Sequence, residues 1–76
     1  TAADAERRMQ IWVNGEARSA PEGQTVRELV EALDLSPQGV AVEVNREVVP
    51  RGTHAEHVLH DGDRVEVVRA IGGGSR

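Results

Sequence analysis

The sequence contains no cysteine, no phenylalanine and no tyrosine, and each absence removes a class of structure or chemistry. Without cysteine there is no disulfide framework, no thiolate metal site and no cysteine nucleophile. A single tryptophan is the only aromatic residue. The core of the protein must therefore be aliphatic, built mostly from Val, Leu and Ile.

An excess of basic residues and a long apolar run are also missing. The net charge is -4, which argues against nucleic acid or an anionic membrane as a partner. No apolar run approaches the roughly 20 residues of a membrane span, and residues 1–8 are polar without a signal-peptide pattern. We therefore expect a cytoplasmic protein. Its 76 residues suffice for one domain, predicted as a disordered leader (1–8), a folded domain (9–71) and a flexible glycine-rich tail (72–76).

Alternation of apolar and polar residues predicts five short strands. Asn14-Gly15 is the strongest two-residue hairpin signal, because both positions tolerate a positive φ angle, and Asn45-Arg46 is a second tight turn. Asp61 and Asp63 flank a glycine and are typical of a turn rather than of an acid/base pair. The predicted strands are 9–13, 16–20, 40–44, 47–49 and 64–68.

One amphipathic helix is predicted after the second strand. Thr25 and Glu28 have the spacing of a capping box, in which each side chain accepts a hydrogen bond from the other residue's backbone N–H. An apolar stripe follows at helical spacing, and the helix is expected to end near Asp34, before Ser36-Pro37. The stripe consists of Val26, Leu29, Val30 and Leu33.

This order of elements favours an α+β fold of the β-grasp (ubiquitin-like) type. Such a roll has a mixed sheet of four to five strands, with one main helix packed on one face and the first and last strands parallel at its centre. A ferredoxin-like fold is the alternative, but it needs a second full helix. The segment 52–60 is too short and too rich in His and Gly to form one.

Five sequence segments in this order resemble the ThiS family of ubiquitin-like sulfur carriers. They span most of the chain, and together with their short spacings they are specific although each alone is weak. The segments are Ile11-Trp12-Val13-Asn14-Gly15, Gln24-Thr25-Val26-Arg27-Glu28-Leu29, Val42-Glu43-Val44-Asn45 with Val48-Val49-Pro50-Arg51, Asp61-Gly62-Asp63-Arg64-Val65-Glu66, and Ile71-Gly72-Gly73.

The resemblance implies a carrier protein that acts as a cosubstrate of partner enzymes and is not itself an enzyme. An E1-like adenylating enzyme of the ThiF type would use ATP to activate the C-terminal glycine, and sulfur from a donor would replace AMP. The resulting thiocarboxylate would give its sulfur to a thiazole synthase of the ThiG type. The chain itself would bind no cofactor.

The resemblance places the reactive carboxylate in the tail formed by Gly72, Gly73 and Gly74. Glycine lets catalytic groups approach the carbonyl from both sides. The family ends in Gly-Gly, whereas here a third glycine is followed by Ser75-Arg76. Which glycine is the mature end therefore stays open, as does the alternative that this stretch is only a flexible linker.

A docking surface is predicted on the side of the sheet that faces away from the core. The alternation places Trp12, Ala41 and Val68 outward, and Arg69 precedes the tail. The alternative reading is ordinary surface scatter with a solvated edge charge. The free protein is expected to be a monomer.

Three histidines give no metal site by their spacing. His54, His57 and His60 are three residues apart, so they would not gather on one face of a helix, and we interpret them as surface loop residues. Two other functions remain open. One is a MoaD-like carrier for molybdopterin or another sulfur-containing product, and the other is a ubiquitin-like interaction module whose tail has no chemistry.

Overall fold

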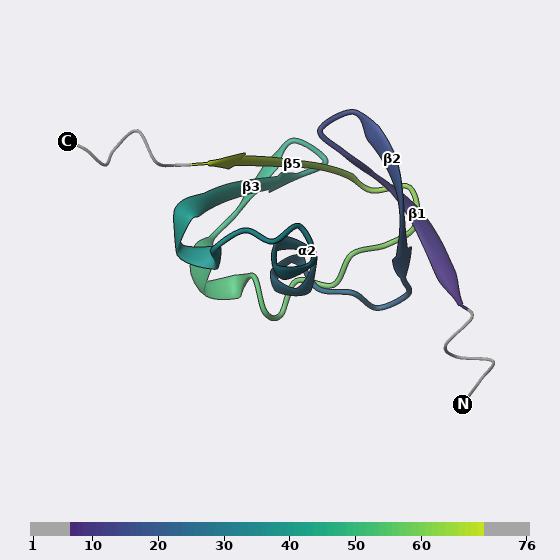
Figure 1. Cartoon of the computed structure of the whole chain (residues 1–76), viewed down its shortest axis with the longest axis horizontal. Helices are drawn as coiled ribbons and strands as arrows, with labels where there is room; N and C mark the ends of the chain where they lie inside the picture. Colours follow the sequence, from purple (N-terminus) through teal and green to yellow (C-terminus); the bar gives the residue numbers. More distant parts are fainter. Residues whose placement is uncertain (1–6, 70–76) are drawn as a thin grey trace.

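The computed structural model of the protein describes residues 7–69. They form one five-stranded sheet with the α-helix α2 (Val26–Ala32) against one of its faces (Figure 1). The strand order is β2-β1-β5-β3-β4. The strands are β1 (Arg8–Val13), β2 (Glu16–Pro21), β3 (Val40–Val44), β4 (Glu47–Val49) and β5 (Arg64–Arg69).

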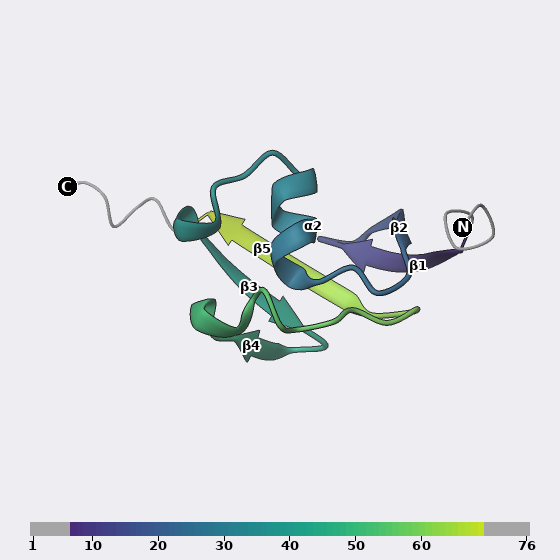
Figure 2. The same ribbon diagram turned by 90° about the horizontal axis from the view of Figure 1, so that it is seen from below.

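The first and last strands lie side by side and parallel at the centre of this sheet, as the β-grasp prediction requires. Trp12 is in register with Arg64 and Val13 with Val65. The other neighbouring strands are antiparallel. The second view shows α2 lying across the sheet (Figure 2). Within residues 7–69 there is no second α-helix, only the short 3₁₀ turns η1 (Pro37–Gly39) and η2 (Arg51–Thr53), so the ferredoxin-like alternative is wrong.

Both predicted tight turns are present. Asn14 and Gly15 have φ angles of 52° and 87°, and Asn45 and Arg46 have φ angles of 53° and 72°. Two consecutive residues with positive φ give the local twist that joins antiparallel strands through a two-residue loop. β1 begins at Arg8, one residue before the expected start of the domain. The rest of the predicted leader, apart from Arg7, lies outside the described residues.

The capping box at the start of α2 is formed as predicted. The Thr25 hydroxyl accepts from the Glu28 N–H at 3.1 Å, and the Glu28 carboxylate accepts from the Thr25 N–H at 3.0 Å. Two further N–H groups of the first turn donate to the connection between β4 and β5, from Val26 to the His57 carbonyl and from Arg27 to the His54 carbonyl. The helix N-terminus is thus satisfied by its own cap and by this connection.

The core is aliphatic and lies between α2 and the sheet. Val13, Leu33 and Leu35 pack against its edge. No helix among the described residues is long and apolar enough to cross a membrane. The buried apolar residues are Met9, Ile11, Ala20, Val26, Leu29, Val30, Val40, Val42, Val44, Val49, Leu59, Val65 and Val67.

The interpretation of His54 as a surface residue is wrong. Its side chain is 3% exposed, and Nε2 lies 3.0 Å from the carbonyl oxygen of Val49. The other ring nitrogen, Nδ1, is buried without a hydrogen-bond partner among the described residues. The physical reason is that the β4–β5 connection crosses the core beside α2, and η2 turns His54 inward while His60 remains exposed.

Candidate functional site

Strand β5 carries the end of the domain from which the predicted reactive tail continues. It lies between β1 and β3, and its last residue is Arg69 (Figure 1). The predicted tail residues Gly72, Gly73 and Gly74 lie outside the described residues. The structure therefore bears on the site through the strand from which the tail continues and through the surface around it.

The two sides of β5 are held very differently. β3 pairs with it over five residues, from Val44–Val65 to Val40–Arg69. β1 pairs with it over two residues only, through hydrogen bonds from Trp12 N to Asp63 O and from Asn14 N to Val65 O, each 2.9 Å.

The Asn14 side chain extends this short parallel pairing by one step. Its Oδ1 accepts from the Val67 N–H at 2.9 Å, and its Nδ2 donates to the Val67 carbonyl at 3.2 Å. A carboxamide can do both because it carries one acceptor and one donor group. Sequence reasoning found Asn14 as a turn residue and missed this second contact, which depends on a partner 53 positions away.

We call the side of the sheet opposite α2 the outer face. All three apolar residues predicted to face outward lie on it, but the sheet separates them. Ala41 and Val68 are directly opposite each other on β3 and β5, and Val68 is 60% exposed. Trp12 is half-buried, with the Arg64 guanidinium carbon 6.0 Å from its ring centroid.

Arg64 and Val68 are four residues apart on β5, which corresponds to about 13 Å along an extended strand. Trp12 therefore belongs to a different part of the outer face from Ala41 and Val68. Arg69 is exposed, but it is in register with the core residue Val40 and so lies on the side of the sheet that faces α2, where it lines a depression with Asp34. Of the four predicted docking residues, the structure brings together only Ala41 and Val68 on the outer face.

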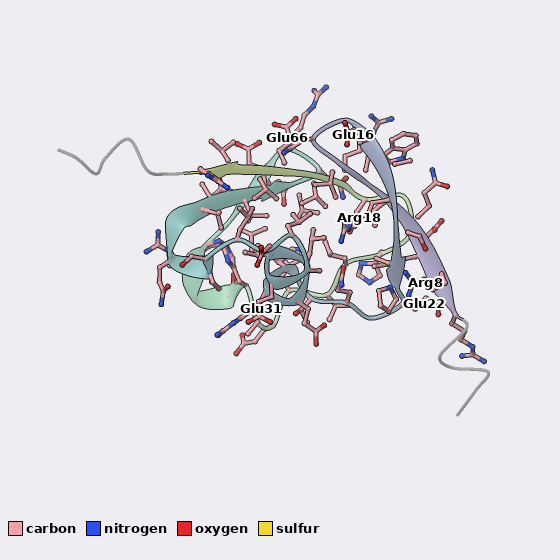
Figure 3. The ribbon with its side chains drawn as sticks, in the orientation of Figure 1. Arg8, Glu16, Arg18, Glu22, Glu31 and Glu66 are labelled. Atoms are coloured by element: carbon pink, nitrogen blue, oxygen red, sulfur yellow. The ribbon has the colours of Figure 1, made fainter. Side chains whose placement is uncertain are left out.

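Two features of the outer face were missed by sequence reasoning. Val48 of β4 is 70% exposed and lies opposite Glu43. Its position follows from the inward direction of Val49, so the alternation would have found it. Glu43 in turn lies opposite Glu66 of β5, whose side chain points away from α2 (Figure 3). That pairing depends on the register between distant strands.

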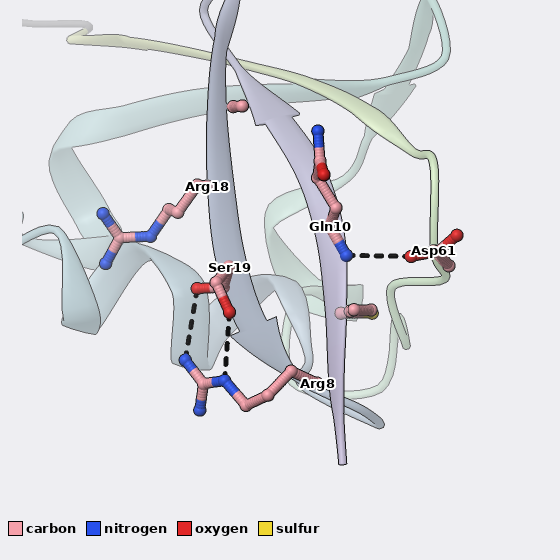
Figure 4. Close-up of a pocket in the computed structure, with 7 residues that line it drawn as sticks. Arg8, Gln10, Arg18, Ser19 and Asp61 are labelled. Carbon is pink, nitrogen blue, oxygen red and sulfur yellow. Dashed lines mark hydrogen bonds between the residues drawn. The ribbon is translucent and has the colours of Figure 1, made fainter. Parts of the chain in front are cut away.

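A shallow depression on the β1–β2 hairpin is held together by structural hydrogen bonds (Figure 4). The Arg8 guanidinium donates to the Ser19 hydroxyl at 3.0 Å, and Asp61 accepts from the Gln10 backbone N–H at 2.8 Å. Asp63 accepts from the His60 N–H within the turn and from the Asn45 carboxamide, whereas Asp61 ties the turn to β1 through Gln10. Among residues 7–69 no group of three His, Cys, Asp or Glu side chains is arranged for a metal ion.

The ThiS family model matches residues 11–74 of this chain. The chain belongs to the ThiS family. It is 42% identical over 66 residues to the protein named sulfur carrier protein ThiS of Escherichia coli, a match that covers 87% of this chain and 100% of that protein. The family assignment made from the sequence is thereby confirmed, and the match includes the three tail glycines.

A solved structure supports the same family and the β-grasp fold. The thiamine biosynthesis protein ThiS from Geobacter metallireducens superposes with a TM-score of 0.75 at 36% identity, over 87% of this chain and 100% of that chain. A thiazole synthase of Magnetococcus marinus is 47% identical over 66 residues, which are 87% of this chain but only 20% of that protein. The ThiS relatives are named as carriers, which agrees with the prediction that this chain is a carrier and not an enzyme.

Proposed function

We propose that this member of the ThiS family carries sulfur for thiamine biosynthesis as a thiocarboxylate on its C-terminal glycine. In the first step the glycine carboxylate attacks the α-phosphorus of ATP on an E1-like adenylating enzyme, and pyrophosphate leaves. In the second step a sulfide-level nucleophile, hydrosulfide in the simplest case, attacks the acyl carbon and AMP leaves, which gives the thiocarboxylate without a change of oxidation state. The thiocarboxylate then delivers its sulfur to a thiazole synthase. The proposed compartment is the cytoplasm, where ATP is available.

The observation that carries this proposal is the match to the Escherichia coli sulfur carrier over the whole length of that protein. A carrier needs a folded body that partner enzymes recognise and a glycine end that fits a narrow active site. The sequence supplies the glycines, and β5 supplies a strand that leaves the centre of the sheet toward them.

The match to two thiazole synthases favours thiazole formation over molybdopterin synthesis as the destination of the sulfur. Each of these enzymes contains a segment of 66 or 67 residues that is more than 40% identical to this chain. A carrier-like segment within the synthase fits a reaction in which carrier and synthase work together. We therefore propose a separate thiazole synthase as the second partner of this chain.

The test is a reconstitution in two stages. The protein ending in a glycine is incubated with a ThiF-type enzyme, ATP and a sulfur donor, and intact-mass spectrometry measures exchange of oxygen for sulfur. We expect exchange only when ATP is present. The product is then offered separately to a thiazole synthase and to the large subunit of molybdopterin synthase. Sulfur transfer only to the latter would favour a MoaD-like role, and no exchange with any such enzyme would favour a plain interaction module.

A further inference from the structure

Asn14 sits at the point where the pairing between β1 and β5 stops. The backbone of β1 leaves the sheet there, because Asn14 and Gly15 turn it into β2. β5 continues in the same direction for four more residues after Val65. On the side facing β1, the last part of β5 thus has no neighbouring strand among the described residues.

The backbone N–H and C=O of Val67 point to the same side of β5 as the carbonyls that pair with β1. Asp63 and Val65 use their carbonyls to accept from β1, and Val67 follows at the same two-residue spacing. Val67 is 8% exposed, so an unpaired N–H or C=O there would carry a desolvation cost. The Asn14 carboxamide satisfies both groups at 2.9 and 3.2 Å.

The turn alone does not require this side chain. Glycine would fit a φ angle of 52° without any contact to β5, and Asp would tolerate the angle as well. Aspartate would place a second oxygen against the Val67 carbonyl, whereas glycine would leave both groups of Val67 open. Asparagine is the residue that fits the turn and also pairs with Val67.

We propose that Asn14 is a positioning residue that fixes the direction in which β5 delivers the C-terminal glycine to the adenylating enzyme. This inference rests on the function proposed above. β3 holds the last part of β5 from one side, and Asn14 is the contact from the other side at Val67. A change in the direction of β5 at Val67 displaces Val68 and Arg69, the last described residues, and with them the point from which the tail continues. A displacement of about 1 Å at a reacting carboxylate can lower a rate 100-fold.

The test compares Asn14→Gly with a matched variant at the other tight turn, Asn45→Gly. Asn45 has nearly the same φ angle, and its side chain also makes two hydrogen bonds, one to Asp63 and one from the Arg64 N–H. Those bonds hold the start of β5, whereas the bonds of Asn14 hold its end. Both variants keep a residue suited to the turn. Asn14→Asp is a second variant at position 14, because aspartate also tolerates the turn but cannot donate to the Val67 carbonyl.

Amide hydrogen exchange measures the contact directly. In Asn14→Gly we expect exchange of the Val67 N–H to become about 5- to 30-fold faster, in line with the loss of one buried hydrogen bond. The Arg64 N–H should respond in Asn45→Gly instead. Unchanged exchange of Val67 in Asn14→Gly would overturn the proposal.

Adenylation kinetics separate positioning from general stability. Each variant is prepared with a chain that ends in glycine and is given to a ThiF-type enzyme with ATP. We expect Asn14→Gly to lower the kcat of adenylation at least tenfold, with little change in the KM for the carrier protein. Asn45→Gly should leave kcat within about twofold of the wild type. Equal losses in the two variants would overturn the positioning role, whereas a wild-type protein that is never adenylated would instead reject the proposed function.

Discussion

Glu43 and Glu66 lie directly opposite each other on the outer face, in register across β3 and β5. Neither carboxylate forms an ion pair with another described residue. Side chains opposite each other in an antiparallel pair have Cβ atoms about 5 Å apart, so the two negative charges repel. Arg46 and Arg64 line the same depression as the two carboxylates, so any net cost of this repulsion to folding is small.

Replacing one of the two glutamates should stabilise the protein. We expect Glu66→Gln to raise the free energy of unfolding by about 0.2–1 kcal/mol at neutral pH and low salt, with a smaller gain at high salt. Glu47→Gln is the control, because Glu47 lies opposite Val44 rather than an acid. Denaturant titration measures both, and equal effects of the two substitutions would contradict the assignment to cross-strand repulsion.

The helix should depend on its N-terminal cap. Both hydrogen bonds of the Thr25/Glu28 box are present, and Thr25→Ala removes the hydroxyl that accepts from the Glu28 N–H. We expect a loss of about 1 kcal/mol in unfolding free energy, whereas Thr25→Ser should retain most of the stability. A melting temperature of Thr25→Ala equal to that of the wild type would show that the cap contributes nothing.

The outer face should matter more for partner binding than for folding. We expect Val68→Asp to leave the fold intact, because the side chain is 60% exposed, and to weaken binding to the adenylating enzyme at least tenfold. The same substitution at Val58, which is 43% exposed in the β4–β5 connection, is the matched control. Calorimetric titration with the adenylating enzyme measures the affinity of each variant. Similar affinities for both variants would argue against a docking role of Val68.

The length of the tail should decide whether the protein reacts. We expect forms ending at Gly73 or Gly74 to be adenylated and thiolated, and the form ending at Arg76 to react poorly until it is trimmed. The reason is that a terminal arginine puts a bulky charged side chain where the enzyme must hold the carboxylate against ATP. Intact-mass spectrometry of the three forms measures the exchange, and equal thiolation of the Arg76 form would reject the need for trimming.

Local sequence patterns were enough to predict the strands, the turns and the helix. Val40, Val42 and Val44 point inward as their alternation indicates, and the Asn14-Gly15 turn fixes the first hairpin. Such signals act over two to four residues, which is why they can be found without a structure.

The contacts that the sequence did not reveal join residues far apart in the chain. The burial of His54 depends on where the β4–β5 connection crosses the core, and the opposition of Glu43 and Glu66 depends on strand register. The pairing of Asn14 with Val67 requires β1 and β5 to be parallel and offset by a defined step. Each follows from tertiary packing, for which alternation and turn signals carry no information.

The parallel arrangement of β1 and β5 also has a mechanical consequence. Because the two strands run side by side in the same direction, Arg8 and Arg69 lie at opposite ends of the sheet (Figure 1). Tension applied between them would load the bonds from Trp12 to Asp63 and from Asn14 to Val65 simultaneously and in shear. A hairpin pulled at its open end breaks its bonds one after another. A molecular motor pulling the domain from these two ends would therefore have to break the bonds between β1 and the chain of β5 together rather than in turn.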